Sequence, residues 1–329
     1  MSVSEADTQD LRGAPSPDAS FTNALLHKLK RRVTLSHLVP AFVHEVEKVL
    51  RQNERLEWRL QRLHRACGRV ERRQTADAPT LQEAEFQVFS QWGEDGAIQW
   101  LLGRVPVERR FFVEFGVEAY DEANTRFLLT DCGWSGLIID SDPDQVAIIH
   151  QNNVYWNYDL RAVASLVTAQ NMNQLLEDQG AVGDIGLLSI DIDGMDWHVW
   201  RAITVAQPRV VICEYNSLFG ADRAVTVPYD PFFDRRSAHH SLCYYGASLG
   251  ALVKLAGDKG YDLVGCGTSG LNAFFVRRDV RPASVPPVSA REAFIPGSFC
   301  EYHDEGGQRK KMSRQEMVRL VTSLPLQEV

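Results

Sequence analysis

The stretch GLLSIDIDGMDWHVW, at positions 186–200, decides the fold of this chain. Its apolar start, Gly186–Ile190, ends abruptly in three acidic residues, Asp191, Asp193 and Asp196. A second run of the same kind, RVVICEYN at 209–216, ends in Glu214 and Asn216. Continuous apolar runs of this length are typical of strands that are buried on both faces of a parallel sheet.

In open α/β sheets, ligands bind beyond the carboxyl ends of the strands. Two adjacent strands that end in this way would bring four carboxylates and an amide to one place. Such a cluster repels itself unless a cation, a proton or a substrate group neutralises it. The sequence therefore predicts a ligand-binding site at the ends of these two strands.

The composition is ordinary for a globular protein, with 329 residues, 44% of them hydrophobic and 24% charged. A formal net charge of −8 argues against a dedicated nucleic-acid binder, since those proteins carry a basic face. No apolar run approaches the roughly 20 residues that span a bilayer, and the first residues lack the features of a secretory signal. The six cysteines contain no Cys-x-x-Cys pair, so they fit neither a zinc ribbon nor a disulfide framework. We therefore expect a cytoplasmic protein.

The chain divides into four segments. Residues 1–34 are expected to be a disordered tail, and residues 35–75 a coiled-coil helix. Residues 84–279 alternate between strand and helix patterns, which predicts a doubly wound α/β domain with a mostly parallel sheet. Residues 280–329 are expected to be a C-terminal tail with a short helix.

The segment 35–75 carries a heptad pattern. Its inward positions alternate in steps of three and four, at Val46, Val49, Asn53, Leu56, Leu60, Leu63, Cys67 and Val70. Asn53 falls at an a position, where a buried Asn pairs with its counterpart and favours a parallel two-stranded coil. The pattern predicts a homodimer. The alternative is one amphipathic helix packed on the surface of its own domain.

Within 84–279, apolar runs predict the strands of the sheet, at Arg110–Phe115, Gly136–Ile139, Val154–Tyr158, Gly186–Ile190, Val210–Cys213, Tyr261–Cys266 and Ala273–Val276. A helix is expected over 163–177. In this assignment Asp159 follows the third strand.

The order of these segments resembles a known family. FFVEFG, GLIID, LLSIDIDG, VVICEYN and GYDLVG…NAFFV together resemble a class I S-adenosylmethionine-dependent methyltransferase. The strings DIDGMD (191–196), SQWGED (90–95) and EANTRFLL (122–129) are similar to the FkbM-like group. The resemblance covers about 86–278 and implies a Rossmann-like fold with S-adenosylmethionine as cofactor. It also implies transfer of a methyl group to a hydroxyl of a sugar, a glycan or a small secondary metabolite.

The resemblance assigns the cofactor to the first two strand ends. Gly116 would let the backbone approach the cofactor where a Cβ would clash. Glu114 would meet the methionine ammonium group or support the loop that does. Asp140 would accept both ribose hydroxyls, because a carboxylate offers two acceptor oxygens.

Two further cofactor contacts lie outside these strands. Asp159 would meet the adenine amino group or cap the following helix, and Gln91 would contact the cofactor from the lead-in. The loop Glu118–Asp121 stands where the family often has a second glycine.

The acceptor side resembles metal-assisted O-methyltransferases such as catechol O-methyltransferase. Asp191, Glu214 and Asn216 are similar to the cation ligands of those enzymes, and hard oxygen ligands suit Mg²⁺ or another divalent cation. Asp193 is either a further ligand or a general base, or it forms a turn with Asp196 that caps the next helix.

A methyltransferase that works without a metal needs another base. The adjacent His239 and His240 are the candidates, because histidine titrates near neutral pH. Two other functions remain open. One is a non-catalytic scaffold that acts through its coiled coil, and the other is a nicotinamide-dependent enzyme, which the absence of Gly-x-Gly-x-x-Gly disfavours.

Overall fold

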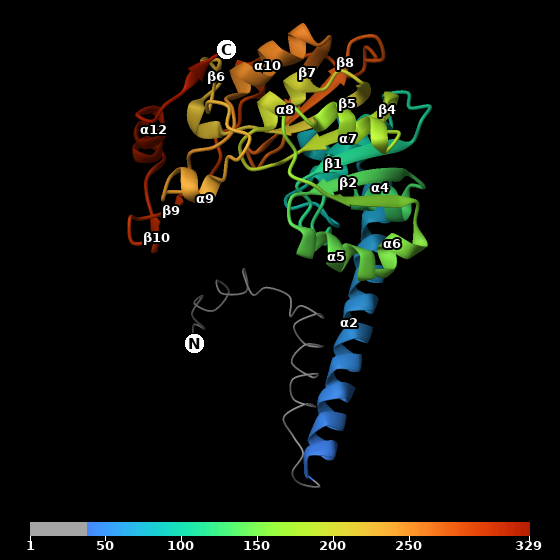
Figure 1. Cartoon of the computed structure of the whole chain (residues 1–329). Coiled ribbons are helices and arrows are strands. Elements are labelled where there is room, and N and C mark those ends of the chain that lie inside the picture. The colour runs from blue at the N-terminus through green and yellow to red at the C-terminus, as the bar shows by residue number, and fades with distance from the viewer. Residues whose placement is uncertain (1–37) are drawn as a thin grey trace, which may run out of the picture. The chain divides into compact units, whose positions relative to one another are not determined.

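The computed structural model describes residues 38–329 (Figure 1). The predicted tail 1–34 lies outside the described residues. The chain forms two compact units, Met1–Leu63 and His64–Val329, and each is considered by itself.

A single long helix, α2 (Leu38–Gln74), fills the predicted coiled-coil segment. No helix in residues 38–329 is long and apolar enough to cross a membrane. Pairing of α2 with a second copy stays a prediction, because one chain is present.

A seven-stranded, mostly parallel sheet forms the second unit, as predicted. Its strands are β1 (Phe111–Phe115), β2 (Ser135–Asp140), β3 (Leu160–Ala164), β4 (Gly183–Ile190), β5 (Ala206–Glu214), β7 (Tyr261–Cys266) and β8 (Asn272–Arg277). The order across the sheet is β3-β2-β1-β4-β5-β8-β7. The first five of these are parallel to one another, and β8 is antiparallel to both β5 and β7.

Helices cover both faces of the sheet, which explains why the central strands are apolar without alternation. On one face, Phe112, Leu187 and Ile212 lie in a core with α3 (Glu94–Leu102), α4 (Arg126–Asp131) and α5 (Pro143–Gln151). On the other face, Val113, Leu188 and Val211 lie in a core with α7 (Met172–Asp178), α8 (Asp196–Ala202) and α10 (Leu249–Asp258). The predicted Rossmann-like, doubly wound fold is confirmed.

The third strand differs from the prediction. The aromatic run 154–158 belongs mainly to a short helix, α6 (Asn153–Asn157), and the strand comes later, at β3. The Asn152 side chain accepts the Val154 N–H at 2.9 Å, and this N-cap satisfies the first turn of α6. Because β3 runs to Ala164, the helix expected over 163–177 is shortened to α7.

The C-terminal segment contains the predicted short helix, α12 (Arg314–Thr322), and returns to the domain. Strand β11 (Gln327–Glu328) pairs with β6 (Val225–Thr226) in antiparallel fashion. Met317 and Val321 of α12 are buried in a small core with Val225. A hairpin of β9 (Glu301–His303) and β10 (Arg309–Lys311) precedes α12. Two other short helices, α9 (Arg235–Ala238) and α11 (Ala290–Ala293), come earlier in the chain.

Candidate functional site

The strand order reverses between β1 and β4. From β1 the chain proceeds to β2 and β3 on one side, and then crosses back to β4 on the other side of β1. Open α/β sheets bind their ligands at such a switch point, beyond the carboxyl ends of the strands. The site is therefore expected where the loops after β1 and β4 meet.

These two loops touch one another. Gly116 has a φ of +73°, and a Cβ added there would lie 1.7 Å from the carbonyl oxygen of Asp191. The prediction for Gly116 named a close approach to the cofactor, whereas the structure shows a close approach to the neighbouring strand end. The requirement for glycine is the same, but its cause is the contact between the two loops.

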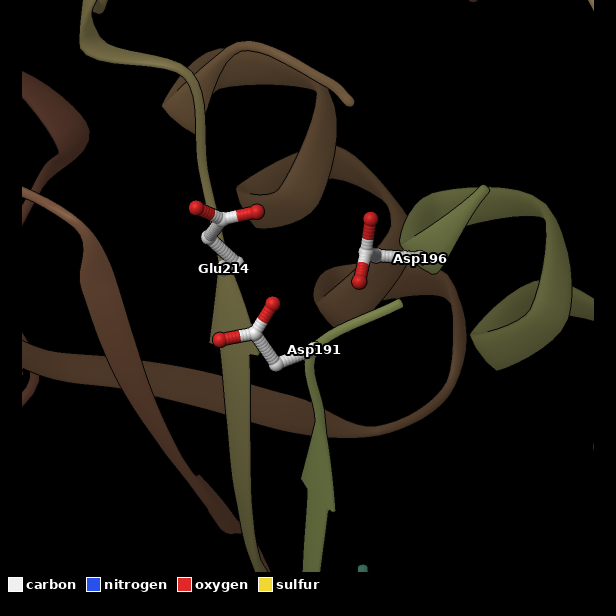
Figure 2. A group of neighbouring side chains, drawn as sticks. All are labelled: Asp191, Asp196 and Glu214. Carbon is white, nitrogen blue, oxygen red and sulfur yellow. The ribbon is translucent and has the colours of Figure 1, made fainter. Parts of the chain in front are cut away.

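Three carboxyl groups converge beyond β4 and β5, from Asp191, Asp196 and Glu214. One oxygen from each lies within 4.8 Å of the other two, and Figure 2 shows the three side chains pointing toward one another. Asp191 directly follows β4, Asp196 begins α8, and Glu214 is the last residue of β5. The convergence predicted from the two strand ends is therefore present for Asp191, Asp196 and Glu214, whereas Asp193 and Asn216, also predicted to converge, are not in this group.

The members of this acidic cluster differ in their partners. Asp196 accepts the backbone N–H groups of Ile192 and Gly194, at 2.9 and 3.0 Å, so it braces the loop as well as joining the cluster. Within the described residues, Oε2 of Glu214 is buried and has no hydrogen-bond partner. Buried polar atoms without a partner are rare, and a position for a ligand or ion is one explanation of such an atom.

Burial and mutual repulsion shift the titration of the cluster. Burial first, and then the carboxylate of Asp196, raise the pKa of Asp191 well above its usual range. Burial and the Asp191 carboxylate do the same for the pKa of Glu214. Burial also raises the pKa of Asp196 to about 6, although its N–H donors oppose the shift. The cluster thus retains protons at pH values where isolated carboxyl groups have lost them.

One guanidinium group reaches this region from a distant segment. Arg235 donates to Asp193 at 2.8 Å and to the carbonyl of Leu242 at 2.6 Å, and it lies over the ring of Tyr245. Asp193 is mostly exposed, so this ion pair contributes little to stability. Arg235 therefore lowers the negative charge at the mouth of the site without neutralising the buried cluster.

Backbone strain concentrates in the same region. In residues 38–329, four residues other than glycine have a positive φ, namely Glu118, Tyr120, Asp193 and Leu242. Glu118 and Tyr120 follow β1, Asp193 follows β4, and Leu242 accepts the bond from Arg235. Such conformations cost about 1–3 kcal/mol each and cluster at functional sites.

The loop after β1 is held by Asp140, at the end of β2. Oδ2 of Asp140 accepts the N–H groups of Val117 and Glu118, at 2.9 and 2.7 Å, and Oδ1 accepts that of Asp142, at 2.9 Å. A carboxylate has about four acceptor positions, so one position remains for a ribose hydroxyl. The predicted cofactor contact of Asp140 stays a prediction, and the structure adds a second role in shaping the loop.

Glu114 is buried beneath the same loop. It accepts the N–H groups of Asn124 and Thr125, at 2.8 and 3.1 Å, as well as the Thr125 hydroxyl. Burial raises the pKa of Glu114 to about 7 in spite of these donors. Of the two predicted roles, the structure favours support of the loop.

Asp159 is excluded from the site by the position of β3. It is exposed and directly precedes that strand, and its carbonyl accepts the N–H of Gly136 at 3.0 Å near the start of β2. Asp159 therefore lies at the amino ends of the strands, opposite the switch point. The predicted contact with adenine was wrong because it depended on a strand at 154–158.

Asn216 also differs from its predicted role as a metal ligand. Its amide nitrogen donates to the carbonyls of Cys243 and Tyr245, and its oxygen accepts the N–H of Leu218 at 3.0 Å. The side chain thus ties the end of β5 to a neighbouring loop. Asp196 takes the place of Asn216 in the set of converging oxygens.

Three other residues predicted for the site, Gln91, His239 and His240, make contacts outside the acidic cluster. Gln91 is exposed and accepts a bond from the indole N–H of Trp92 at 3.1 Å. His239 bonds with Ser241 at 2.8 Å and lies against the ring of His240. No hydrogen bond or ion pair within residues 38–329 joins either histidine to the cluster, and their role as a base stays a prediction.

No family model matches this sequence, and no curated protein matches it. Among solved structures, the chain is similar to the N-terminal domain of EvdMO1 with S-adenosylhomocysteine bound, at 11% identity and a TM-score of 0.39. This match covers 63% of the chain and 94% of that domain. The same domain in the presence of D-fucose gives 11% identity and 0.37, over 65% and 96% of the two chains.

A third similar structure is PKMT2 from Rickettsia typhi in complex with S-adenosylhomocysteine. It shares 8% identity at a TM-score of 0.37, over 57% of this chain and 53% of that one. Similarities at this level do not define the function of the chain, which has to be argued from its own site.

Proposed function

We propose that the chain is an S-adenosylmethionine-dependent O-methyltransferase that acts on a hydroxyl group of a sugar, a glycan or a small metabolite with the help of a divalent cation. The observation that carries this proposal is the charge of the switch point. Five carboxyl groups, from Glu114, Asp140, Asp191, Asp196 and Glu214, lie at the ends of β1, β2, β4 and β5. A site of this sign favours cationic ligands.

The turn after β1 argues against a dinucleotide cofactor. A pyrophosphate needs free backbone N–H groups at the turn after β1 and a helix that starts there. Here the N–H groups of Val117 and Glu118 already donate to Asp140, and α4 does not begin until Arg126. S-adenosylmethionine instead carries a sulfonium and an ammonium group, which suit an acidic site. One of its ribose hydroxyls would donate to the remaining acceptor position of Asp140, instead of the two that the sequence predicted.

A divalent cation fits the acidic cluster. Asp191, Asp196 and Glu214 supply hard oxygen ligands, and Oε2 of Glu214 is a buried acceptor without a partner. When bound there, the cation would lower the pKa of a coordinated hydroxyl group. Asp193 remains a proposed base or additional ligand from the exposed side of the loop.

The chemistry also requires a proton acceptor. S-adenosylmethionine supplies an electrophilic methyl group, and its transfer to a hydroxyl oxygen releases neutral S-adenosylhomocysteine and one proton. With a cation held by Asp191 and Glu214, these carboxylates act as ligands, so the proton would pass to Asp193, or to His239 or His240 if no cation is bound.

Calorimetric titration of the full chain with S-adenosylmethionine tests the proposal, with Mg²⁺ in one series and a chelator in the other. We expect micromolar binding in the wild type. Asp191→Asn should lose metal-dependent binding, while the matched control Asp144→Asn, an exposed carboxylate in the first turn of α5, should retain it. Absence of binding in both series would overturn the enzyme assignment and leave the scaffold function.

A second measurement separates the metal from the cofactor. Titration of Mn²⁺ followed by electron paramagnetic resonance reports cation binding without any turnover. Binding that is lost in Glu214→Gln supports the cluster as the cation site. A wild type that binds S-adenosylmethionine but no Mn²⁺ would remove the cation and leave the cofactor assignment in place.

A further inference from the structure

The long helix α2 has an exposed apolar stripe. Its a and d positions between Phe42 and Val70 include six large apolar side chains that are each 51–61% exposed, namely Phe42, Val49, Leu56, Leu60, Leu63 and Val70. Cys67, at an a position, is exposed as well. Exposed apolar stripes of this length are typical of binding surfaces.

The opposite face of α2 is the one that contacts the domain. Within the unit that begins at His64, Arg65 and Arg69 each bond to Asp131 at 2.7 Å. Gly68 is buried, and a Cβ added there would lie 2.3 Å from Val88 and 3.1 Å from Phe127. In the heptad register these three helix residues occupy positions f, c and b, which lie away from a and d.

For the part of α2 that begins at His64, this contact favours the coiled-coil interpretation of the heptad pattern. An amphipathic helix that belonged to its own domain would bury its apolar face there. Here the polar face of α2 contacts the domain instead, because Arg65 and Arg69 donate to Asp131, whose side chain is only 2% exposed. The end of α2 is thus fixed to the domain in the orientation that leaves Cys67 and Val70 uncovered.

The shape of the stripe indicates a single helical partner. It is confined to a and d positions, and the flanking e and g positions are mostly polar, with Glu45, Gln52, Glu57, Arg59, His64 and Glu71. A strict a/d stripe is the seam of a coiled coil, whereas helices of globular cores present a wider face. Val46 at a, with Leu56 and Leu63 at d, follows the pattern that favours two strands.

Asn53 identifies the partner. It is the polar member of the seam, and every d position from Phe42 to Val70 is apolar. In an antiparallel pair, a residues face d residues, so Asn53 would be buried against an apolar side chain. In a parallel pair in register, Asn53 faces Asn53 of the second copy and the two amides bond to each other.

The residues at the e and g positions do not oppose that register. In a parallel pair, each g position lies beside the e position five residues later on the other helix. The resulting pairs are Glu45 with Leu50, Gln52 with Glu57, Arg59 with His64 and Ala66 with Glu71. None of these pairs opposes two carboxylates or two guanidinium groups.

We propose that α2 forms a parallel, in-register, two-stranded coiled coil with a second copy of this chain. The contacts of Arg65, Gly68 and Arg69 with the domain leave the last a and d positions, Cys67 and Val70, available to the second helix. The inference does not depend on the proposed methyl transfer. A failure of one would leave the other unaffected.

Sedimentation velocity of the full chain is the first test. We expect twice the chain mass of 37.1 kDa. The double variant Leu56→Asp with Leu60→Asp should give the single mass. The matched double variant Arg55→Asp with Gln61→Asp places the same acids at c and b positions and should keep the dimer. A monomeric wild type, or a dimer that survives the seam variant, would overturn the proposal.

Cys67 provides a test that needs no disruptive substitution. In a parallel pair in register, the two Cys67 thiols face each other at one a layer. Oxidation by copper phenanthroline and air in a Cys300→Ser background should give a covalent dimer on a non-reducing gel. That band should vanish when Cys67 is also replaced by Ser. A dimer in solution that yields no Cys67 cross-link would refute the parallel register.

Discussion

Replacing Glu214 with Gln should stabilise this protein at alkaline pH, although most buried substitutions destabilise a fold. Glu214 is 6% exposed, has a buried oxygen without a partner in the described residues, and faces Asp191 and Asp196. Gln has nearly the same shape and removes the charge. The substitution therefore isolates the electrostatic cost of the acidic cluster.

The size of the effect follows from the geometry. Two unit charges 4.8 Å apart repel by about 3.5 kcal/mol at an effective dielectric constant of about 20. Protonation of the wild type relieves part of this repulsion, and the new amide N–H₂ lacks a partner at a cost of about 1–3 kcal/mol. We expect a net gain of about 1 kcal/mol at pH 8 in the presence of a chelator, which is about 2 °C in Tm.

The pH dependence has a defined sign. The folded-state pKa of Glu214 is raised above its usual value of 4.5, so the folded chain binds more protons than the unfolded chain above that pH. The stability that protonated Glu214 contributes is fully present below pH 4.5 and is lost as the pH rises through the folded pKa. The advantage of Glu214→Gln should therefore shrink toward zero near pH 5.

Thermal denaturation at pH 5 and pH 8, each with chelator or with Mg²⁺, measures all of these effects. Mg²⁺ at 100 times its dissociation constant should stabilise the wild type by about 2.7 kcal/mol and the variant much less. Asp144→Asn, which removes an exposed carboxylate of α5 outside the acidic cluster, serves as the control and should change the Tm little. A variant that is less stable than the wild type at pH 8 in chelator would refute the reasoning.

Three further substitutions test the loops around the site. Gly116→Ala should destabilise the fold by roughly 3 kcal/mol, because the new methyl group would clash with the Asp191 carbonyl and because Gly116 has a positive φ. An unchanged Tm would contradict the close contact. Asp95→Ala should lower the free energy of unfolding, measured by urea denaturation, by about 3 kcal/mol. The reason is that the buried Asp95 accepts the backbone N–H groups of residues 88–90. Asp140→Ala should weaken S-adenosylmethionine binding at least tenfold by calorimetry, because it frees the loop after β1. Its control, Asp142→Ala, removes only the N-cap of α5 and should leave the affinity nearly unchanged.

The sheet was predictable because its signal is local. FFVEF, at 111–115, is buried at every position, and such a run has few alternatives to a strand under two layers of helices. The convergence of Asp191 and Glu214 followed from the same signal, since parallel neighbours end at one edge. The run at 154–158 misled the assignment because its aromatic residues suit a strand, while the Asn152 cap starts a helix.

The rest of the site depends on contacts that no local pattern reveals. Arg235 reaches Asp193 across 42 residues of sequence. The engagement of Asn216 by the carbonyls of Cys243 and Tyr245 likewise requires the folded loop. Asp196 was predicted both to converge with the other carboxylates and to form a turn, and its bonds to the N–H groups of Ile192 and Gly194 let it do both. Side-chain partners across loops are set by tertiary structure rather than by residue spacing.

The acidic cluster is costly for a chain that needs only a fold. Cys213, one residue before Glu214 on β5, is fully buried in the core, and an apolar residue in place of Glu214 would lengthen that core without repulsion. Glu214 instead brings an unpartnered oxygen to Asp191 at the point where the strand order reverses. A bound cation or proton removes the repulsion, so the free energy that the fold loses here becomes binding free energy for the ligand. Stability and ligand affinity are then two measures of the same electrostatic interaction.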